Sequence, residues 1–539
     1  MRPASRNSEE KDIRIRPTSF PWRSIQSASV SRNGMVSTAH HQATDIGIRV
    51  LEDGGNAIDA AVACAFALGV CEPAASGLGG QTMMLVYHSP SRRKIALDGS
   101  SRAPYAVVPG TVDLAGLRRG HRSSTVPSTP AVLAYAVSNY GTRDLGEILA
   151  PVIELAEKGY KVSPLQRALT RRERRYLKNT TAAQYFLVEG RKSPPIGHTL
   201  RQPALANTLR RISREGVEDF YTGSIARSIV ADMARNDGLI RSEDLAQIPW
   251  PIERRPVTGR FGAARVFTMP PPGAGRTLIE MLNIVSHMKP REYDPETPRG
   301  ATILAGIIRQ AFLDRRDRPF DPSFYQQVDE RFMLDPEYAK RVARRARKTL
   351  PLHGETTHLS VMDREGSVVA LTQSIESVFG SCVAHPELGF LYNNYMSAFE
   401  HKDMSHPYYL RPGAVPWASV APTIVFRGRT PWLAIGSPGS ERITPSILQV
   451  LVRLEKGYSL YEAVEAPRLH CSLNGTVSIE RLRMDPDTTT SLEQAGYSVT
   501  ARDPYSFYLG CVQAVMRKDG QFHGAADPRR DGAAGGPRT

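Results

Sequence analysis

The sequence predicts an α+β fold in which layers of helices cover stacked β-sheets. Between residues 41 and 316 apolar residues recur mostly at the spacing of amphipathic helices, with short strand-like stretches between them. After residue 356 short apolar runs are separated by turns rich in Gly and Pro, which is the pattern of strands. The chain has 539 residues, 41% of them hydrophobic, so it can bury a large core. Such elements bury their apolar faces best by packing in layers.

The first elements along the chain follow from local signals. Residues 1–33 are polar and are expected to form an N-terminal arm. Residues 41–53 have helical periodicity, and Asn56 can cap a second helix over residues 57–70. The other elements expected before residue 320 are strands at 83–87, 94–98 and 258–270 and helices at 145–157, 203–214, 224–236, 277–287 and 302–316.

The later elements begin with a hairpin. Strands are expected over residues 357–362 and 367–373, joined by a turn at 363–366. Residues 333–348 are polar and basic, which predicts an exposed linker ahead of this hairpin. Helices follow at 446–454 and 460–466, and the Gly-, Pro-, Ala- and Arg-rich tail from about residue 524 is expected to be disordered. No long Ser/Gly linker divides the chain, so one interleaved globule is predicted.

Composition excludes some classes of function. No apolar run is long enough to span a membrane, and residues 1–23 lack the apolar core of a secretory signal, so a cytoplasmic protein is expected. The net charge of +15 is spread over several predicted helices without an aromatic-interleaved basic stripe, which disfavours nucleic acid as a partner. The five cysteines form no metal-ligand or disulfide pattern. No cofactor or metal is expected.

Thr356 is the strongest candidate for a catalytic nucleophile. A threonine at the start of a strand is ordinarily structural, because its branched side chain suits a pleated sheet. If the chain is cut between Glu355 and Thr356, however, one residue carries a hydroxyl and a free amine. An N-terminal amine has a pKa of about 7.7–8.0, so part of it can act as a base at neutral pH. Nucleophile and base would then share one residue.

A set of motifs surrounds this threonine in a characteristic order and spacing. With them the chain resembles the gamma-glutamyltransferase (gamma-glutamyltranspeptidase) family of N-terminal-nucleophile hydrolases, from about Gly34 to about Gly520. The motifs are Gly54–Ala61, Glu72-Pro73, Ser76–Gly80, Glu355–Asp363, Phe379–Ser381, Gly389–Asn394 and Gly436–Ile443.

The resemblance implies a four-layer αββα sandwich and an autocatalytically processed proenzyme. Cleavage would give a large segment (residues 34–355) and a small segment that begins at Thr356 (residues 356–539), which stay together as a heterodimer. A dimer of heterodimers is left open. The family also implies glutathione metabolism and a small-molecule amide substrate.

The resemblance carries the catalytic roles onto particular residues. In the family two consecutive glycine amides stabilise the oxyanion, and the matching pair here is Gly439-Ser440. A backbone N–H survives replacement of Gly by Ser if Ser440 can adopt the same dihedral angles, although a plain turn is the alternative. The family's second threonine, eighteen residues after the nucleophile, falls on Ser374, which retains the hydroxyl.

Substrate recognition departs from the family. The carboxylate-binding arginine falls on Ser100, and Arg102 comes two residues later. The family's asparagine falls on Glu376, and its glutamine falls on Tyr395. The ammonium-binding aspartate is Ala398, and one hydroxyl of a serine pair remains, at Ser419.

Losing two charged clamps would weaken binding of a glutamyl group by about 3–6 kcal/mol. We therefore expect a changed acyl group. Glu376 could meet an ammonium or be a solvent-facing strand residue, and Tyr395 could form an aromatic wall or belong to the core.

Two classes of function compete. The first is a Thr356-dependent amidohydrolase or acyltransferase, acting on a gamma-glutamyl or another small acyl amide, with oxamate-type and acylase-type substrates as alternatives. The second is an unprocessed, non-catalytic relative that binds an acidic partner.

Overall fold

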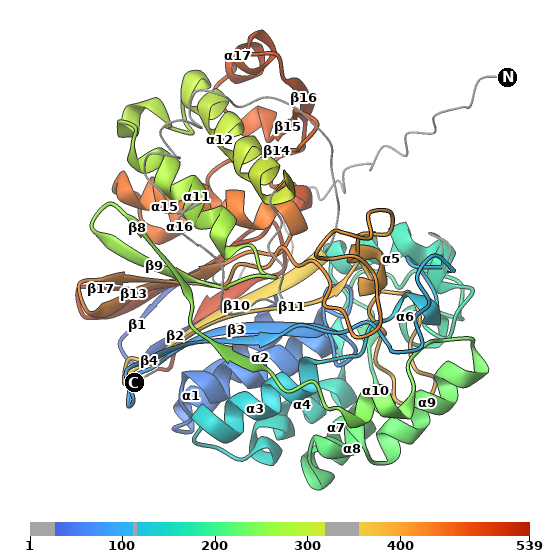
Figure 1. Ribbon diagram of the computed structural model, residues 1–539. Coiled ribbons are helices and arrows are strands. Elements are labelled where there is room, and N and C mark those ends of the chain that lie inside the picture. Colours follow the sequence, from blue (N-terminus) through green and yellow to red (C-terminus); the bar gives the residue numbers. More distant parts are fainter. Residues whose placement is uncertain (1–26, 112–115, 318–354, 539) are drawn as a thin grey trace, which may run out of the picture.

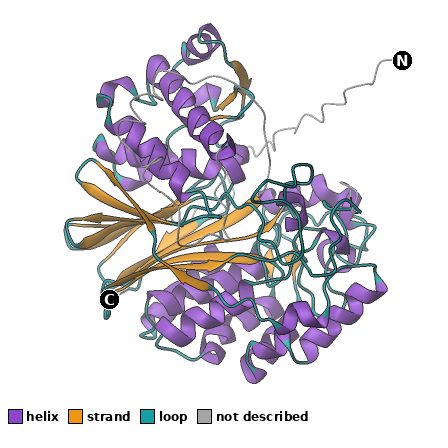
Figure 2. Ribbon diagram, in the orientation of Figure 1, coloured by secondary structure: helices purple, strands orange, loops and turns teal. Residues whose placement is uncertain are grey.

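Two seven-stranded sheets stack face to face, and helices cover the outer face of each (Figures 1 and 2). The computed structural model describes residues 27–111, 116–317 and 355–538. The arrangement confirms the predicted α+β class and the four-layer αββα sandwich. None of the helices in these three ranges is long and apolar enough to cross a bilayer.

The first sheet carries the candidate nucleophile, and all of its strand pairs are antiparallel. Its central strands β10 and β11 form the predicted hairpin. In spatial order the strands are β19 (Ala533–Gly535), β2 (Gly34–Thr38), β10 (Glu355–Asp363), β11 (Val368–Glu376), β3 (Gln81–His88), β4 (Arg93–Gly99) and β7 (Ile252–Arg254).

The second sheet is also antiparallel throughout. Its strands, in spatial order, are β1 (Ala28–Ser31), β18 (Gln521–Ala526), β17 (Gln513–Lys518), β13 (Thr430–Gly436), β12 (Thr423–Arg427), β9 (Ala264–Thr268) and β8 (Val257–Phe261).

Side-chain alternation along the strands builds a core on each side of a sheet. On β3, Met83 and Leu85 point into the layer between the sheets, whereas Met84 and Val86 pack beneath the helices. Between the sheets the ring of Phe426 meets that of Phe267 edge to face, with centroids 5.1 Å apart. Because both faces are covered, central strands such as β3 and β11 are buried along almost their whole length, unlike strands with one face in water.

Four helices lie over the first sheet: α1 (His41–Glu52), α2 (Ala57–Cys71), α3 (Thr129–Tyr140) and α4 (Leu145–Lys158). The central helix α2 is buried along nearly its whole length, which its Ala-rich surface permits. Asn56 caps it as predicted: its side chain accepts from the N–H of Asp59, whose carboxylate accepts from the N–H of Asn56. This cap fixes the start of a helix whose far end reaches the candidate site.

The second sheet is covered by α11 (Gly275–Ser286), α12 (Pro298–Asp317), α15 (Ile443–Glu455) and α16 (Leu460–Glu465). The remaining elements are α5 (Pro164–Leu177), α6 (Ala183–Phe186), α7 (Pro203–Glu215), α8 (Glu218–Tyr221), α9 (Ser224–Arg235), α10 (Ser242–Ala246), α17 (Thr488–Gln494), β5 (Tyr160–Lys161), β6 (Thr199–Leu200), β14 (Leu469–Cys471), β15 (Thr476–Ile479) and β16 (Ser498–Ala501).

Three sequence-based expectations need correction or lie outside the description. The strand expected at 258–270 is two strands, β8 and β9, because the chain turns at Gly262 with a φ of 56°. Within the expected polar arm, β1 pairs with β18. The predicted linker at 333–348 lies outside the described residues.

The prediction of a disordered tail is wrong. Residues 521–526 form β18, and 533–535 form β19, which pairs with β2. Between them Arg529 is fully buried and makes a two-pronged ion pair with Glu480, at 2.6 and 2.8 Å. It also meets Asp527 at 3.0 Å. Tail composition is uninformative here because strand pairing and buried ion pairs hold the segment in addition to its few apolar residues.

Replacing Arg529 by Met should destabilise the protein by about 3–5 kcal/mol, because it leaves Glu480 buried without its main partner. Thermal or denaturant unfolding measures the loss. The matched control is Arg481→Met, since Arg481 is exposed and should tolerate the change. Equal stability of the two variants would contradict the structural role assigned to Arg529.

Candidate active site

Thr356 lies at an irregularity in the first sheet. Glu355 pairs with Glu376 and Thr357 pairs with Gln373, so the register between β10 and β11 shifts at Thr356. The extra residue lies on β11, where Ser374 and Ile375 stand opposite Thr356, and a bulge of this kind changes the direction of the side chains beside it. Glu376, opposite the proposed cleavage site, has a φ of 76°, a left-handed conformation that costs a non-glycine residue about 1 kcal/mol or more. Thr356 itself is 5% exposed.

The carbonyl of Thr356 is held by a residue from the far end of the chain. Arg530 donates from one guanidinium nitrogen to the Thr356 carbonyl oxygen at 3.0 Å and to a Glu72 carboxylate oxygen at 2.7 Å. The guanidinium also packs against the ring of Phe507, 4.5 Å from its centre. Glu72 follows the C-terminus of α2, and burial raises the pKa of its carboxyl while Arg530 opposes the rise.

Sequence reasoning missed Arg530 because it was assigned to a disordered tail. Three arginines and two aspartates within a few residues of an apolar strand were an available signal, since such a cluster can form buried pairs. The sequence indicated Glu72 only as part of the Glu72-Pro73 motif, without a role.

Ser374 lies on β11 one strand away from Thr356. Its hydroxyl accepts the N–H of Glu376 at 2.8 Å, and Ser374 is directly opposite Gln81 of β3. The Tyr395 hydroxyl hydrogen-bonds with Ser374 and Gln81, and burial raises the pKa of Tyr395 well above its ordinary value. Tyr395 is therefore a core residue, one of the two roles considered for it, and its hydroxyl reaches the ends of β11 and β3.

The predicted oxyanion loop follows β13, whose last residue, Gly436, packs on β10. A Cβ at Gly436 would lie 2.2 Å from the His358 ring, so only glycine fits there. Burial lowers the pKa of His358 to about 3, and the neutral ring meets the hydroxyls of Thr372 and Ser360. The contact fixes the end of β13, from which the loop starts, against β10.

Gly439 and Ser440 both have left-handed backbones, with φ of 117° and 53°. Ser440 thus adopts a conformation that usually favours glycine, which the sequence analysis set as the condition for retaining the family's loop. Within the described parts of the chain, neither residue's backbone N–H donates a hydrogen bond to another group. Two adjacent N–H groups are therefore available to an oxyanion.

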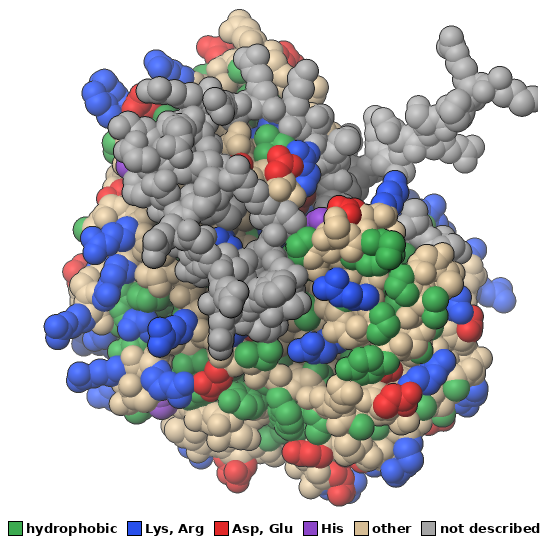
Figure 3. Space-filling view, in the orientation of Figure 1, with side chains coloured by type: hydrophobic (Ala, Val, Ile, Leu, Met, Phe, Trp, Pro, Cys, Tyr) green, Lys and Arg blue, Asp and Glu red, His purple; other side chains and the backbone are tan. Residues whose placement is uncertain are grey.

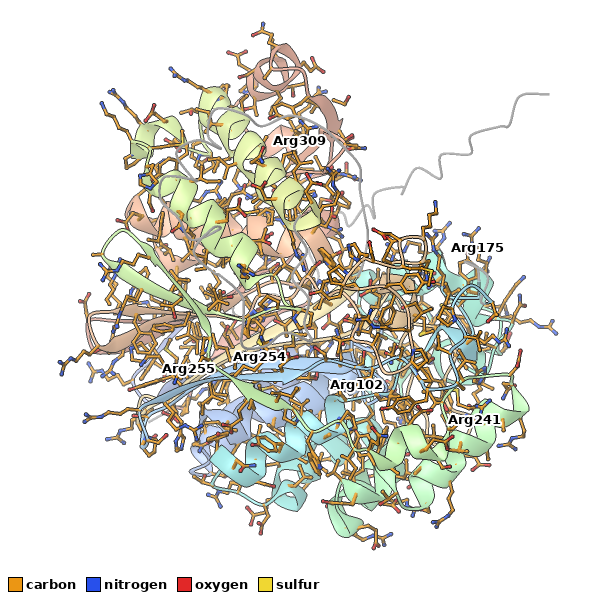
Figure 4. All side chains as sticks on the ribbon, viewed as in Figure 1. Arg102, Arg175, Arg241, Arg254, Arg255 and Arg309 are labelled. Atoms are coloured by element: carbon orange, nitrogen blue, oxygen red, sulfur yellow. The ribbon has the colours of Figure 1, made fainter. Side chains whose placement is uncertain are left out.

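Ser100 and Arg102 follow β4 on one face of an extended segment. The intervening Ser101 points inward and donates to Gln81 at 2.9 Å. Ser100 donates to Asp98 at 2.6 Å. Arg102 is exposed and has no ion-pair partner among the described residues; Figure 4 shows it on the same side of the molecule as Arg254.

A small cavity of about 10 Å³ lies beside these two residues, lined by Asp98, Ser100, Arg102, Pro249, Trp250, Ile252 and Val415. Thr357, Gln373, Thr82 and Gly99 form one cross-strand row. With strands about 4.8 Å apart, Ser100 lies roughly 14 Å from the nucleophile along the sheet.

Ser419 is half-buried and is grouped with residues that the sequence analysis did not single out. The Arg315 guanidinium lies 4.6 Å from the centre of the Trp417 ring and donates to the Ala418 carbonyl. Burial lowers the pKa of Arg315 to about 10. The Tyr408 ring packs edge-on against Trp417 at 4.6 Å. An aromatic and cationic cluster therefore borders Ser419.

The described residues show no metal centre, and the face in Figure 3 shows no basic stripe of the kind that binds nucleic acid. No group of three or more His, Cys, Asp or Glu side chains there could hold a metal ion. The visible Lys and Arg side chains are scattered over the face in Figure 3 and do not form one stripe.

Comparison with known proteins identifies the family of the chain. Residues 43–536 match the model of the family described as gamma-glutamyltranspeptidase. The chain is 32% identical to the glutathione hydrolase proenzyme of Escherichia coli (strain K12) over 534 residues, 93% of this chain and 91% of the relative. It is 34% identical to the acylase ACY 1 proenzyme of Pseudomonas sp. (strain SE83), covering 94% and 93% of the two chains.

Among solved structures, cephalosporin acylase from Bacillus halodurans superposes with a TM-score of 0.86 at 27% identity, covering 98% of this chain and 100% of that one. The match of nearly the whole chain to the family, together with relatives above 30% identity over nine-tenths of their length, settles the assignment. This chain belongs to the gamma-glutamyltranspeptidase family and is an amide-cleaving or acyl-transferring enzyme of that family.

Proposed function

We propose that the chain is a proenzyme that cuts itself between Glu355 and Thr356 and then uses Thr356 as nucleophile. The position of Thr356 carries the proposal: it is a buried hydroxyl residue opposite a bulge of β11, on the strand against which β13 packs before it leads into the Gly439-Ser440 loop. The relatives named as proenzymes support the processing step.

In the first step the Thr356 hydroxyl attacks the carbonyl carbon of Glu355. The acyl group moves from nitrogen to oxygen, which breaks the peptide bond and frees the Thr356 amine. Water then hydrolyses the ester, releasing the Glu355 carboxylate and the Thr356 hydroxyl. In turnover this amine accepts the hydroxyl proton while the oxygen attacks a substrate amide. The leaving amine takes the proton, and the acyl ester on Thr356 is transferred to water or to an acceptor amine.

The N–H groups of Gly439 and Ser440 would stabilise the oxyanion in both reactions. A donor of this kind contributes about 3–4 kcal/mol. The left-handed backbone of Ser440 supports the role, because the serine keeps an N–H in a glycine-like conformation. The serine at position 440 is therefore compatible with a catalytic loop.

The two fragments should remain one folded unit after cleavage. In the first sheet, large-fragment strands β2 and β3 flank small-fragment strands β10 and β11. In the second sheet, β1 pairs with β18 and β9 pairs with β12 across the same division. Separation would break several ladders and expose both cores, so we propose a stable two-chain enzyme.

The acyl group that best fits the site has a terminal carboxylate and needs no α-ammonium. Arg102 is an exposed cation without an ion-pair partner among the described residues, on the same face as Ser100. Ala398 provides no anion where the family has aspartate. Trp250 and Ile252 offer apolar contact beside Arg102. A glutaryl-type amide therefore suits the site better than a gamma-glutamyl amide, and the relatives named as acylases support an acyl group other than glutamyl.

Thr356→Ala should remain a single chain, whereas the wild type should give fragments 1–355 and 356–539. Thr356→Ser keeps the hydroxyl and should still be cut, more slowly. Intact-mass measurement of freshly purified protein distinguishes these products. Cleavage of Thr356→Ala at the same bond would remove Thr356 as the attacking group.

Ser440→Gly should keep kcat within about threefold of wild type, because the N–H and the left-handed backbone are both retained. Ser440→Pro removes the N–H and fixes φ near −65°, so kcat should fall by about 10²–10³ or more. Steady-state kinetics on variants with matched melting temperatures test this. A folded proline variant with wild-type kcat would rule out the oxyanion role.

Arg102→Gln should lower kcat/KM for a glutaryl arylamide by about 10- to 150-fold, the range for one lost charge-assisted hydrogen bond. Turnover of an acetyl or butyryl arylamide should change little, because neither carries the carboxylate. Arg255→Gln is the matched control, an exposed arginine farther along the same edge in Figure 4. An equal loss on charged and neutral substrates would argue against a carboxylate clamp.

A further inference from the structure

We propose that Arg530 is a positioning residue that holds the terminal Thr356 and, with Glu72, sets the protonation of its amine. The inference rests on the proposed function of Thr356. One guanidinium nitrogen bridges the Thr356 carbonyl (3.0 Å) and the Glu72 carboxylate (2.7 Å). All three residues are buried, at 7%, 5% and 8% exposure.

The backbone that carries Arg530 is fixed on both sides. On one side, the Asp527 carboxylate accepts the N–H of Arg529 at 3.0 Å. On the other, the Asp531 carboxylate accepts from the Ser163 hydroxyl at 2.5 Å, and its carbonyl accepts the His41 N–H at 3.2 Å. Arg530 is thus presented to Thr356 by a rigid segment.

This contact matters most after cleavage. A chain end is anchored by one covalent link and tends to fray unless something ties it down. The ladder between β10 and β2 begins at Leu359, so it does not reach Thr356. Arg530 donates a hydrogen bond to the carbonyl oxygen of the peptide group that joins Thr356 to Thr357. It therefore restrains the rotation that would swing the amine and the hydroxyl away from the substrate.

Charge gives Arg530 a second effect. A guanidinium beside the new N-terminus disfavours the ammonium form, so it lowers the pKa of the amine and keeps more of it as free base. The Glu72 carboxylate acts in the opposite direction, and burial raises its own pKa while Arg530 opposes the rise. The Arg530 guanidinium and the Glu72 carboxylate have opposite charges, so the pair as a whole has little net charge. The guanidinium is the member of the pair that contacts Thr356.

The other titratable groups around the pair are mostly uncharged at neutral pH. Burial raises the pKa of Cys71, Cys511 and Tyr160 well above their ordinary values. Asp531 is an exception, because burial raises its pKa only to about 6. Glu376 is the last residue of β11 and pairs with Glu355 of β10. Arg530 is therefore the cation in direct contact with Thr356 among the described residues.

The test compares Arg530→Met, Arg530→Lys and Glu72→Gln in the full-length chain, with exposed Arg517→Met as control. Cleavage half-time, kcat, KM and the pH dependence of kcat/KM are measured for each. Arg530→Met should lower kcat about 10- to 100-fold, the range for one lost charge-assisted hydrogen bond, with little change in KM. Its acidic limb should move to higher pH, because the ammonium form gains stability.

Arg530→Lys keeps the charge and should hold the acidic limb at its wild-type position while kcat falls less. Glu72→Gln should move the limb to lower pH. The proposal is overturned if Arg530→Met keeps wild-type kcat and pH dependence. If that variant does not fold, wild-type kcat in Arg530→Lys, or an unmoved limb in Glu72→Gln, overturns it.

Thr356→Ala in the same series separates the two ideas. If the wild type is uncut, or Thr356→Ala is active, the proposed function fails. If wild type is cut and Thr356-dependent while the Arg530 variants behave like it, only the positioning role fails.

Discussion

The antiparallel pairing of β10 with β2 and β11 is the constraint on which the candidate site depends. It sets the register that shifts at Thr356 and puts Ser374 one strand away, opposite Gln81. The same pairing interleaves segments from before and after residue 355, so that the site is built from both. A cut at this point changes the chemistry of one residue without freeing either part of the fold.

The site shows why chemistry can persist while recognition changes. The proposed oxyanion donors, at Gly439 and Ser440, are backbone N–H groups, so a serine can occupy position 440 when its φ is left-handed. Recognition of a carboxylate or an ammonium relies on side chains, and one substitution removes each clamp. Arg102, with its exposed guanidinium, shows how a cation can return to the same face two residues later.

Much of the framework could be predicted from local signals. The Asn56 cap, the β10–β11 hairpin and the helices at 203–215 and 443–455 follow from periodicity and turn residues. The contacts of Arg530, Glu72 and Tyr395 could not, because they join segments hundreds of residues apart or depend on a hydroxyl's direction. The composition of the tail misled for the same reason. Arginine and aspartate side chains are usually solvated, and Arg529 and Asp527 stabilise the fold because they pair with each other in the core.

Backbone strain at the scissile position fits a chain arranged to cut itself. Glu376, opposite Glu355, has a φ of 76°, and its neighbour Ile375 is held by the carbonyl of Ala75 at 3.2 Å. The extra residue of this irregularity lies on β11, where Ser374 and Ile375 both stand opposite Thr356, so Glu355 stays paired with the strained Glu376. Cutting the bond before Thr356 would release that constraint while Arg530 retains the new terminus. Strain would thus favour the cut, and the contact with Arg530 would keep the product ordered.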